Sequence, residues 1–253
     1  MKRKLNAGKV RYWVLLWLAL LSPAHGYEMH WGYEGAEGPS HWGDIKPEFA
    51  TCKTGTHQSP INIVGAQRAE LPPLKFDYRP VPLDVVNNGH TIQVNVEAGS
   101  TFATGDRVYS LVQWHFHAPS EHRVKGRHHD LEVHFVHMDS ERNIAVAAVF
   151  FDAGRESRAL APIWSRLPEK EGRAVRDTNI VVDLMTLLPA DRSYYTFESS
   201  LTTPPCTEGV KWFVLKHPLE LSAAQLARFA RLYRHNERPL QPLNGRLISE
   251  SAD

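Results

Sequence analysis

The feature that most restricts the fold of this chain is a series of segments in which apolar and polar residues alternate. Alternation is found over 91–96, 112–116 and 131–137, and 144–151 is a nearly continuous apolar run. Alternating segments are typical of strands with one buried face, whereas a short apolar run is typical of a strand buried on both faces. The sequence therefore predicts a sheet with several neighbouring strands.

Helices are expected to be few and short. Only 159–167 and 222–234 have a helical pattern, the second with Ser222 as a candidate N-cap. Residues 27–65 are rich in Gly, Pro, Trp and His and predict an irregular N-terminal wrap. Because no repeat, linker or low-complexity tract divides residues 27–253, we expect a single β-dominated α+β domain there.

The N-terminus has the pattern of a cleavable signal peptide over residues 1–26. Five basic side chains precede a short apolar run, 12–21, and small residues follow it. A retained membrane anchor is the alternative, but the run is much shorter than the roughly 20 residues that span a bilayer. We therefore expect a periplasmic or secreted protein, either a monomer or a homodimer.

Charge and cysteine content narrow the class further. Without residues 1–26 the chain carries 24 basic and 28 acidic side chains, a net charge of −4. This balance and the lack of another long apolar span give no indication of nucleic-acid or membrane binding. Cys52 and Cys206 are the only cysteines, and they form no C-x-x-C motif. In an exported chain such a pair favours a disulfide over two free thiols.

The strand at 112–116 carries a candidate half of a metal site. Side chains two positions apart share a strand face, so His115 and His117 lie on one face together with Gln113. An isolated H-x-H pattern is more often a surface or core feature than a metal site. A second source of imidazole is therefore needed to support metal binding.

The strand at 131–137 supplies that second source. Glu132, His134 and Val136 share one face, and a hairpin-like return over 118–130 would bring His134 beside the first two histidines. Three neutral imidazoles with one open position are typical of a catalytic zinc site. Glu132, like Gln113 on the other strand, comes two residues before a candidate ligand and could accept its second ring N–H.

Four other histidines are not expected to be ligands. His128 and His129 lie in a charged turn and are expected to be solvated. His137 points to the opposite strand face from His134, and His217 precedes a proline and is expected to be structural.

Several motifs in order along the chain resemble those of exported, bacterial-type α-class carbonic anhydrases. They are HWGY from His30, GPSHW from Gly38, QSPINI from Gln58, NNGH from Asn87, QWHFHAPSEH from Gln113, SLTTPP from Ser200 and NERP from Asn236. The resemblance covers nearly all of residues 27–253. It implies one domain around a twisted, mostly antiparallel sheet of about ten strands, with short surface helices and one Zn²⁺ at the bottom of a conical cleft.

The resemblance also implies roles for individual residues. His115, His117 and His134 would bind zinc, and Gln113, Glu132 and the backbone carbonyl of Asn236 would orient them. Cys52 and Cys206 match the disulfide of exported members, which would brace the threonine loop that precedes Cys206.

The implied reaction is hydration of carbon dioxide to bicarbonate by a zinc-bound hydroxide. Thr202 would accept a hydrogen bond from the hydroxide and donate one to Glu121, and His90 would carry the released proton to buffer. The substrate would contact Val136, Val146, Leu201, Thr202, Thr203 and Trp212. The polar side of the cleft would comprise Tyr33, Asn88 and Gln93.

Other readings of the same residues remain open at this point. His115, His117 and Glu121 also satisfy the H-x-H-xxx-E pattern of cupins, which use iron or manganese. A cupin would need a second motif with Gly and His downstream, and the Thr-Thr-Pro-Pro loop would have no role in it. A carbonic-anhydrase-like binding module is a non-enzymatic alternative, but such modules lack ligands that are all present here. A zinc carrier would have no use for a threonine gate and an apolar pocket.

Overall fold

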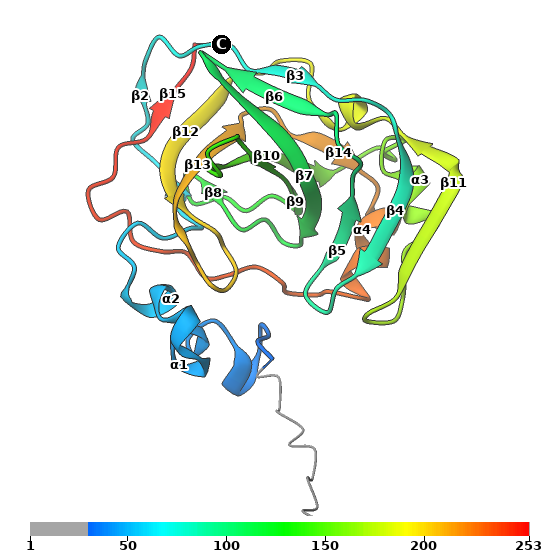
Figure 1. Ribbon diagram of the computed structural model, residues 1–253, viewed down its shortest axis with the longest axis horizontal. Coiled ribbons are helices and arrows are strands. Elements are labelled where there is room, and N and C mark those ends of the chain that lie inside the picture. Colours follow the sequence, from blue (N-terminus) through cyan, green and yellow to red (C-terminus); the bar gives the residue numbers. More distant parts are fainter. Residues whose placement is uncertain (1–29, 253) are drawn as a thin grey trace, which may run out of the picture.

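The computed structural model describes residues 30–252 (Figure 1), so the predicted signal peptide, residues 1–26, lies outside the described residues. Within 30–252 no helix has the length and apolar character needed to cross a membrane.

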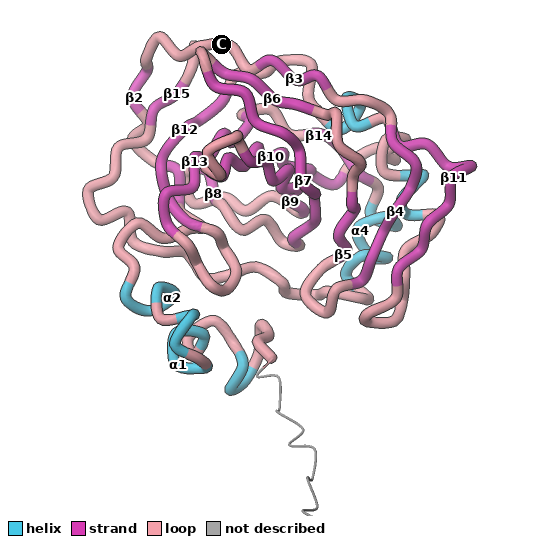
Figure 2. Tube along the Cα trace, in the orientation of Figure 1, coloured by secondary structure: helices cyan, strands magenta, loops and turns pink. Residues whose placement is uncertain are grey.

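A thirteen-stranded mixed sheet dominates the described chain (Figures 1 and 2). Ten strands form its continuous path, which runs in the order β11 (Ala174–Val182), β4 (Val81–Asn87), β5 (Ile92–Asn95), β7 (Arg107–His117), β9 (Leu131–Met138), β10 (Ile144–Ala153), β13 (Glu208–Leu215), β12 (Tyr194–Ser200), β15 (Ser249–Glu250) and β2 (Gln67–Arg68). Nine of its twelve strand pairings are antiparallel. The predicted β-dominated architecture is confirmed.

Five shorter strands complete the sheet structure. β3 (Lys75–Asp77) pairs with β6 (Thr101–Thr104), which continues to β7, and β14 (Leu219–Leu221) pairs in parallel with β10. A separate two-stranded parallel sheet joins β1 (Asn62–Ile63) to β8 (Arg123–Val124).

The helices are short, and both predicted ones are shorter than expected. α4 (Ala223–Ala230) begins at a capping box in which Ser222 and Gln225 exchange hydrogen bonds, and it ends four residues before the predicted 234. α3 covers only Ala161–Trp164 of the predicted 159–167. The remaining helical turns are η1 (Gly35–Glu37), α1 (Trp42–Ile45), η2 (Pro47–Phe49), α2 (Thr51–Thr54) and η3 (Leu184–Leu187).

The two faces of the sheet belong to different apolar clusters. Phe135 and Phe213 pack in the larger cluster, whereas their chain neighbours Val136 and Trp212 pack in the smaller one. This follows from the period of two along a strand, which sends adjacent side chains to opposite faces. His134 shares its face with Val136, so the candidate metal ligands lie on the side of the smaller cluster.

Candidate metal centre

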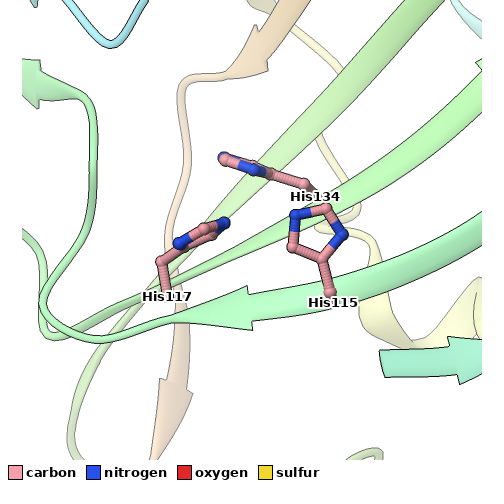
Figure 3. Close-up of side chains that lie close together, drawn as sticks. All are labelled: His115, His117 and His134. Atoms are coloured by element: carbon pink, nitrogen blue, oxygen red, sulfur yellow. The ribbon is translucent and has the colours of Figure 1, made fainter. Parts of the chain in front are cut away.

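The antiparallel pairing of β7 with β9 brings the three candidate histidines together. His115 lies directly across from His134, and His117 follows His115 on the same face of β7. The ring centroids are 4.6 to 5.3 Å apart, and Figure 3 shows the three rings gathered at one point. One nitrogen from each ring lies within 4.8 Å of the other two, so these residues could hold a metal ion.

Each ring is fixed through its second nitrogen by a hydrogen-bond acceptor. The three pairs are His115 Nδ1 with Gln113 Oε1 at 2.9 Å, His117 Nδ1 with the Asn236 carbonyl at 2.7 Å, and His134 Nε2 with Glu132 Oε1 at 2.9 Å. Because an acceptor requires a ring N–H, each pair selects a tautomer and leaves the other nitrogen with a lone pair. Each ring therefore has one free nitrogen to offer to the cluster, and those of His117 and His134 lie near the same oxygen of Glu121.

The electrostatics of the cluster keep these lone pairs available. Burial lowers the pKa of His115 well below its ordinary value, lowers that of His117 to about 4 and also lowers that of His134. His117 Nε2 is buried without a hydrogen-bond partner. A buried polar atom without a partner is costly, and here a metal ion would satisfy it. His115 is only half-buried, which leaves one side of the cluster open.

Glu132 is the most heavily used acceptor of the site. Its carboxylate accepts the His134 ring N–H and also the backbone N–H and ring Nδ1–H of His122, both at 2.8 Å. Burial alone would raise the pKa of Glu132, but the two imidazoles hold it well below its usual range. These three residues form a second group that could hold a metal, although their mutual hydrogen bonds already occupy the nitrogens facing Glu132. The role of His122 was missed from the sequence.

Asn236 connects the end of β7, which carries His117, to the turn that carries His90. Its carbonyl accepts from His117, and its side-chain Oδ1 accepts from the backbone N–H of Ala118 at 2.9 Å. Its Nδ2 donates to the carbonyls of Phe116 and His90 at 2.9 and 3.1 Å. One residue thus positions a candidate ligand and the turn that carries His90.

Glu121 lies beside the open nitrogens. Its Oε2 is 3.5 Å from His117 Nε2 and 3.8 Å from His134 Nδ1, and its Oε1 accepts the backbone N–H of Arg238 at 2.9 Å. Burial raises the pKa of Glu121 to about 7. The Thr202 hydroxyl is close enough to lower this pKa, although Oε2 lacks a hydrogen bond of normal geometry.

Arg238 is a second residue whose importance the sequence did not reveal. Its buried guanidinium donates to Gln58 Oε1 and the Ser59 carbonyl, both at 2.8 Å, and to the Cys52 carbonyl at 2.9 Å. Burial lowers its pKa to about 10, so it remains charged at neutral pH. Arg238 therefore links the Glu121 side of the site to the N-terminal segment.

The predicted disulfide joins Cys52, in α2, to Cys206. Cys206 is fully buried, and its backbone N–H donates to the Thr203 carbonyl at 2.8 Å. The bridge thus braces the loop that contains Thr202 and Thr203 against the N-terminal segment.

An apolar wall adjoins the histidines. Val136, Val146, Leu201 and Trp212 belong to one cluster, and the Trp212 ring centroid is 5.0 Å from that of His134. The structure therefore brings these four predicted contact residues together on the face that carries His134.

The remaining predicted cleft residues, Tyr33, Asn88, Gln93 and Thr203, do not belong to this apolar cluster. Gln93 is the cross-strand neighbour of His115 and accepts from Asn88 Nδ2 at 3.4 Å. The Tyr33 hydroxyl is buried without a partner, and burial raises its pKa. Thr203 is half-buried.

His90 stacks on Trp31 with a centroid separation of 3.5 Å and lies 5.0 Å from the ring of His30. Burial, assisted by His30, lowers the pKa of His90 to about 4. In this orientation the ring is neutral at pH 7 and accepts protons weakly.

The predicted solvation of His129 is wrong. His129 is buried, stacks on Phe150 at 4.2 Å and pairs through Nδ1 with Asp152 Oδ1 at 2.8 Å. Its neighbour His128 is half-buried and bonds to the Ser120 carbonyl at 2.9 Å. The charged residues around His129 suggested a solvated turn, and the sequence did not show that Asp152 on β10 would provide a hydrogen-bond partner for the buried ring. His137 is buried on the other face, where it bonds to the Tyr78 hydroxyl.

Comparison with known proteins places this site in a family context. The profile of the eukaryotic-type carbonic anhydrase family matches residues 37–252. A carbonic anhydrase of Neisseria gonorrhoeae is 46% identical over 234 residues, 92% of each chain. One of Klebsiella pneumoniae is 44% identical over 252 residues, covering 98% of this chain and 100% of that one. The solved α-carbonic anhydrase of Thermovibrio ammonificans, in complex with sulfanilamide, has a TM-score of 0.85 and 46% identity over 87% of this chain and 99% of its own.

Proposed function

Because this chain belongs to the eukaryotic-type, or α-class, carbonic anhydrase family, we propose that it hydrates carbon dioxide reversibly to bicarbonate at the histidine cluster, with one zinc ion held by His115, His117 and His134. The observation that carries the proposal is the set of three convergent lone pairs, each fixed by an acceptor on the far nitrogen. Three neutral imidazoles and an open side fit zinc in a catalytic rather than a structural site.

When bound, zinc would lower the pKa of a coordinated water to about 7 and so supply a nucleophile at neutral pH. The protein's own contribution is orientation. With its proton directed at Glu121, the Thr202 hydroxyl can only accept a hydrogen bond from the attacking oxygen, which restricts how that oxygen faces the substrate. The Arg238 backbone N–H favours the ionised form of Glu121 that this role requires.

Carbon dioxide has no net dipole, so its binding site should be apolar. Val136, Val146, Leu201 and Trp212 would supply this surface beside His134, and Thr203 would lie at its edge.

Proton release would use His90 and the polar residues Tyr33, Asn88 and Gln93. A shuttle near neutral pH needs a pKa closer to 7 than the value of about 4 in the Trp31 stack. We therefore place the proton transfer in a more hydrated rotamer of His90 than the stacked one.

The disulfide supports an oxidising compartment, because such bridges persist in the periplasm or outside the cell. We propose a periplasmic or secreted location, with residues 1–26 as a cleaved signal peptide and 27–253 as the enzyme. A monomer or homodimer remains a prediction for analytical ultracentrifugation.

The test is carbon dioxide hydration by purified residues 27–253, followed by stopped-flow pH change before and after metal removal. We expect activity that is lost with a chelator and regained with one equivalent of zinc, and that is absent in a folded His115→Ala variant. A folded, zinc-loaded chain without hydration would instead support the binding-module reading. Activity restored only by iron would refute zinc as the cofactor.

A further inference from the structure

Two adjoining hollows lie between the end of α4 and the segment 166–175, away from the histidine cluster. Their volumes are about 480 and 270 Å³, and both have Leu167 and Glu169 in their walls. We call them together the basic hollow. Figures 1 and 2 show α3 and α4 on the side of the molecule where β4 and β11 lie, and α3 contacts both strands.

The basic hollow carries a concentration of unpaired positive charge. Five cationic side chains line it, namely Arg166, Lys170, Arg173, Arg228 and Arg231, against the single carboxylate of Glu169. Arg166 lies 3.5 Å from Asp177, but the other four cations have no ion pair among residues 30–252. Because residues 27–253 carry a net charge of −4, this local excess is contrary to the overall balance. An anion in the hollow would relieve the mutual repulsion.

Helix stabilisation explains only part of this cluster. Arg228 lies in the last turn of α4 and Arg231 is its C-cap, where cations complement the partial negative charge of the helix end. Lys170 and Arg173 belong to a different segment and have no such role. They line the smaller hollow, the helix arginines line the larger one, and the two hollows share Leu167 and Glu169 as wall residues. This adjacency of cations from two separate segments indicates a ligand site.

The shape and donor types indicate the ligand class. A volume of about 480 Å³ suits a small molecule, and guanidinium groups match the oxygens of a phosphate in bidentate fashion. Leu167 and Leu232 give the same hollow an apolar portion. We propose that the basic hollow binds a dianionic phosphate group, either inorganic phosphate or a small phosphomonoester. A concave site of this size favours a soluble ligand over a membrane surface.

The basic hollow is connected to the turn before His90 by three hydrogen bonds of Asn87. Asn87 donates from Nδ2 to the Pro168 carbonyl at 3.1 Å and from its N–H to the Arg173 carbonyl at 3.1 Å. The Asn87 carbonyl accepts from Gly172 N–H at 2.8 Å. Ligand binding should therefore perturb the amide of Asn87 as well as those of the hollow itself.

The experiment is a titration of zinc-loaded residues 27–253 with sodium phosphate at constant ionic strength, followed by backbone amide chemical shifts. We expect saturable shifts over 167–175 and 228–232, which separates this site from any phosphate at the histidine cluster. Arg228→Ala/Arg231→Ala and, separately, Arg173→Ala should raise the dissociation constant for phosphate at least about tenfold. The matched control Arg68→Ala/Lys75→Ala removes two exposed cations from β2 and β3 and should bind as the parent does.

Three outcomes would overturn the proposal. They are shifts that rise linearly without saturation, an Arg173→Ala variant with unchanged affinity, and loss of binding in the control variant equal to that in the helix variant. A separate binding experiment uses phosphatidylglycerol vesicles in place of free phosphate. Co-sedimentation with vesicles in the absence of any response to free phosphate would identify a membrane surface and also refute the assignment. Hydration activity is not a readout here, so failure of this site leaves the proposed function untouched.

Discussion

Removing the Cys52–Cys206 disulfide should cost a large part of the stability of this protein. The bridge joins residues 154 positions apart, so it excludes many extended conformations of the unfolded chain. The loop-entropy relation gives about 17 cal/mol/K for this separation, or about 5 kcal/mol at 25 °C. For a chain of this size each kcal/mol shifts Tm by about 2–4 °C, so we expect a fall of about 10–20 °C.

The assay is urea unfolding of residues 27–253, followed by tryptophan fluorescence, with the zinc-loaded protein in every sample. Cys52→Ala/Cys206→Ala is compared with the parent and with the parent reduced by dithiothreitol. Both forms without the bridge should lose similar stability, because they share the missing cross-link and differ only at the side chains of residues 52 and 206, of which only Cys206 is buried. A loss below about 1 kcal/mol in both would refute the reasoning that the bridge acts on the unfolded chain.

Three further changes test the surroundings of the site. Glu132→Gln should weaken zinc binding about 10- to 100-fold in chelator competition, because an amide cannot accept all three N–H groups that the carboxylate accepts; unchanged affinity would contradict this. Phe197→Tyr should add about 1 kcal/mol in urea unfolding, because His122 Nε2 is buried without a partner and the two rings are 5.6 Å apart; no gain would mean that the hydroxyl does not reach. Burial lowers the pKa of His137 to about 3. Between pH 6.5 and 3 the unfolded chain therefore binds a proton at this residue that the folded chain does not. The free energy of unfolding should fall on acidification by up to about 1.4 kcal/mol per pH unit. His137→Gln should reduce that slope, as measured by unfolding at several pH values, and equal slopes would count against it.

The strands that carry the histidines could be predicted from the sequence because their pattern is local. A period of two put His115 and His117 on one face, and the same rule separated His134 from His137. The two helices were placed correctly but too long, since the sequence pattern does not show where tertiary packing replaces the helix. Ala230 and Trp164 end these helices earlier than their apolar periodicity suggests.

Contacts between distant parts of the chain were beyond the reach of pattern alone. The pairing of Cys206 with Cys52 followed from the presence of only two cysteines in a chain expected to be exported, and the pairing of Asn236 with His117 followed from family resemblance. The buried pair of His129 and Asp152 was missed because both residues are polar and 23 positions apart. Arg238 belongs to the NERP motif, but the residues around it form no pattern that predicts its contacts. Its guanidinium donates to three oxygens, one side-chain amide and two backbone carbonyls, all more than 170 positions away in the sequence.

The acceptor of His117 has a consequence for the order in which the protein is made. Asn236 is 119 residues beyond His117, whereas all three histidines lie in one hairpin between 107 and 138. During synthesis the ribosome completes that hairpin long before the peptide group that orients its second histidine. A prematurely terminated chain would thus contain all three candidate metal ligands but would lack the carbonyl that orients His117. The orientation of His117 is therefore completed only when the C-terminal segment that contains Asn236 has been made and has folded against β7.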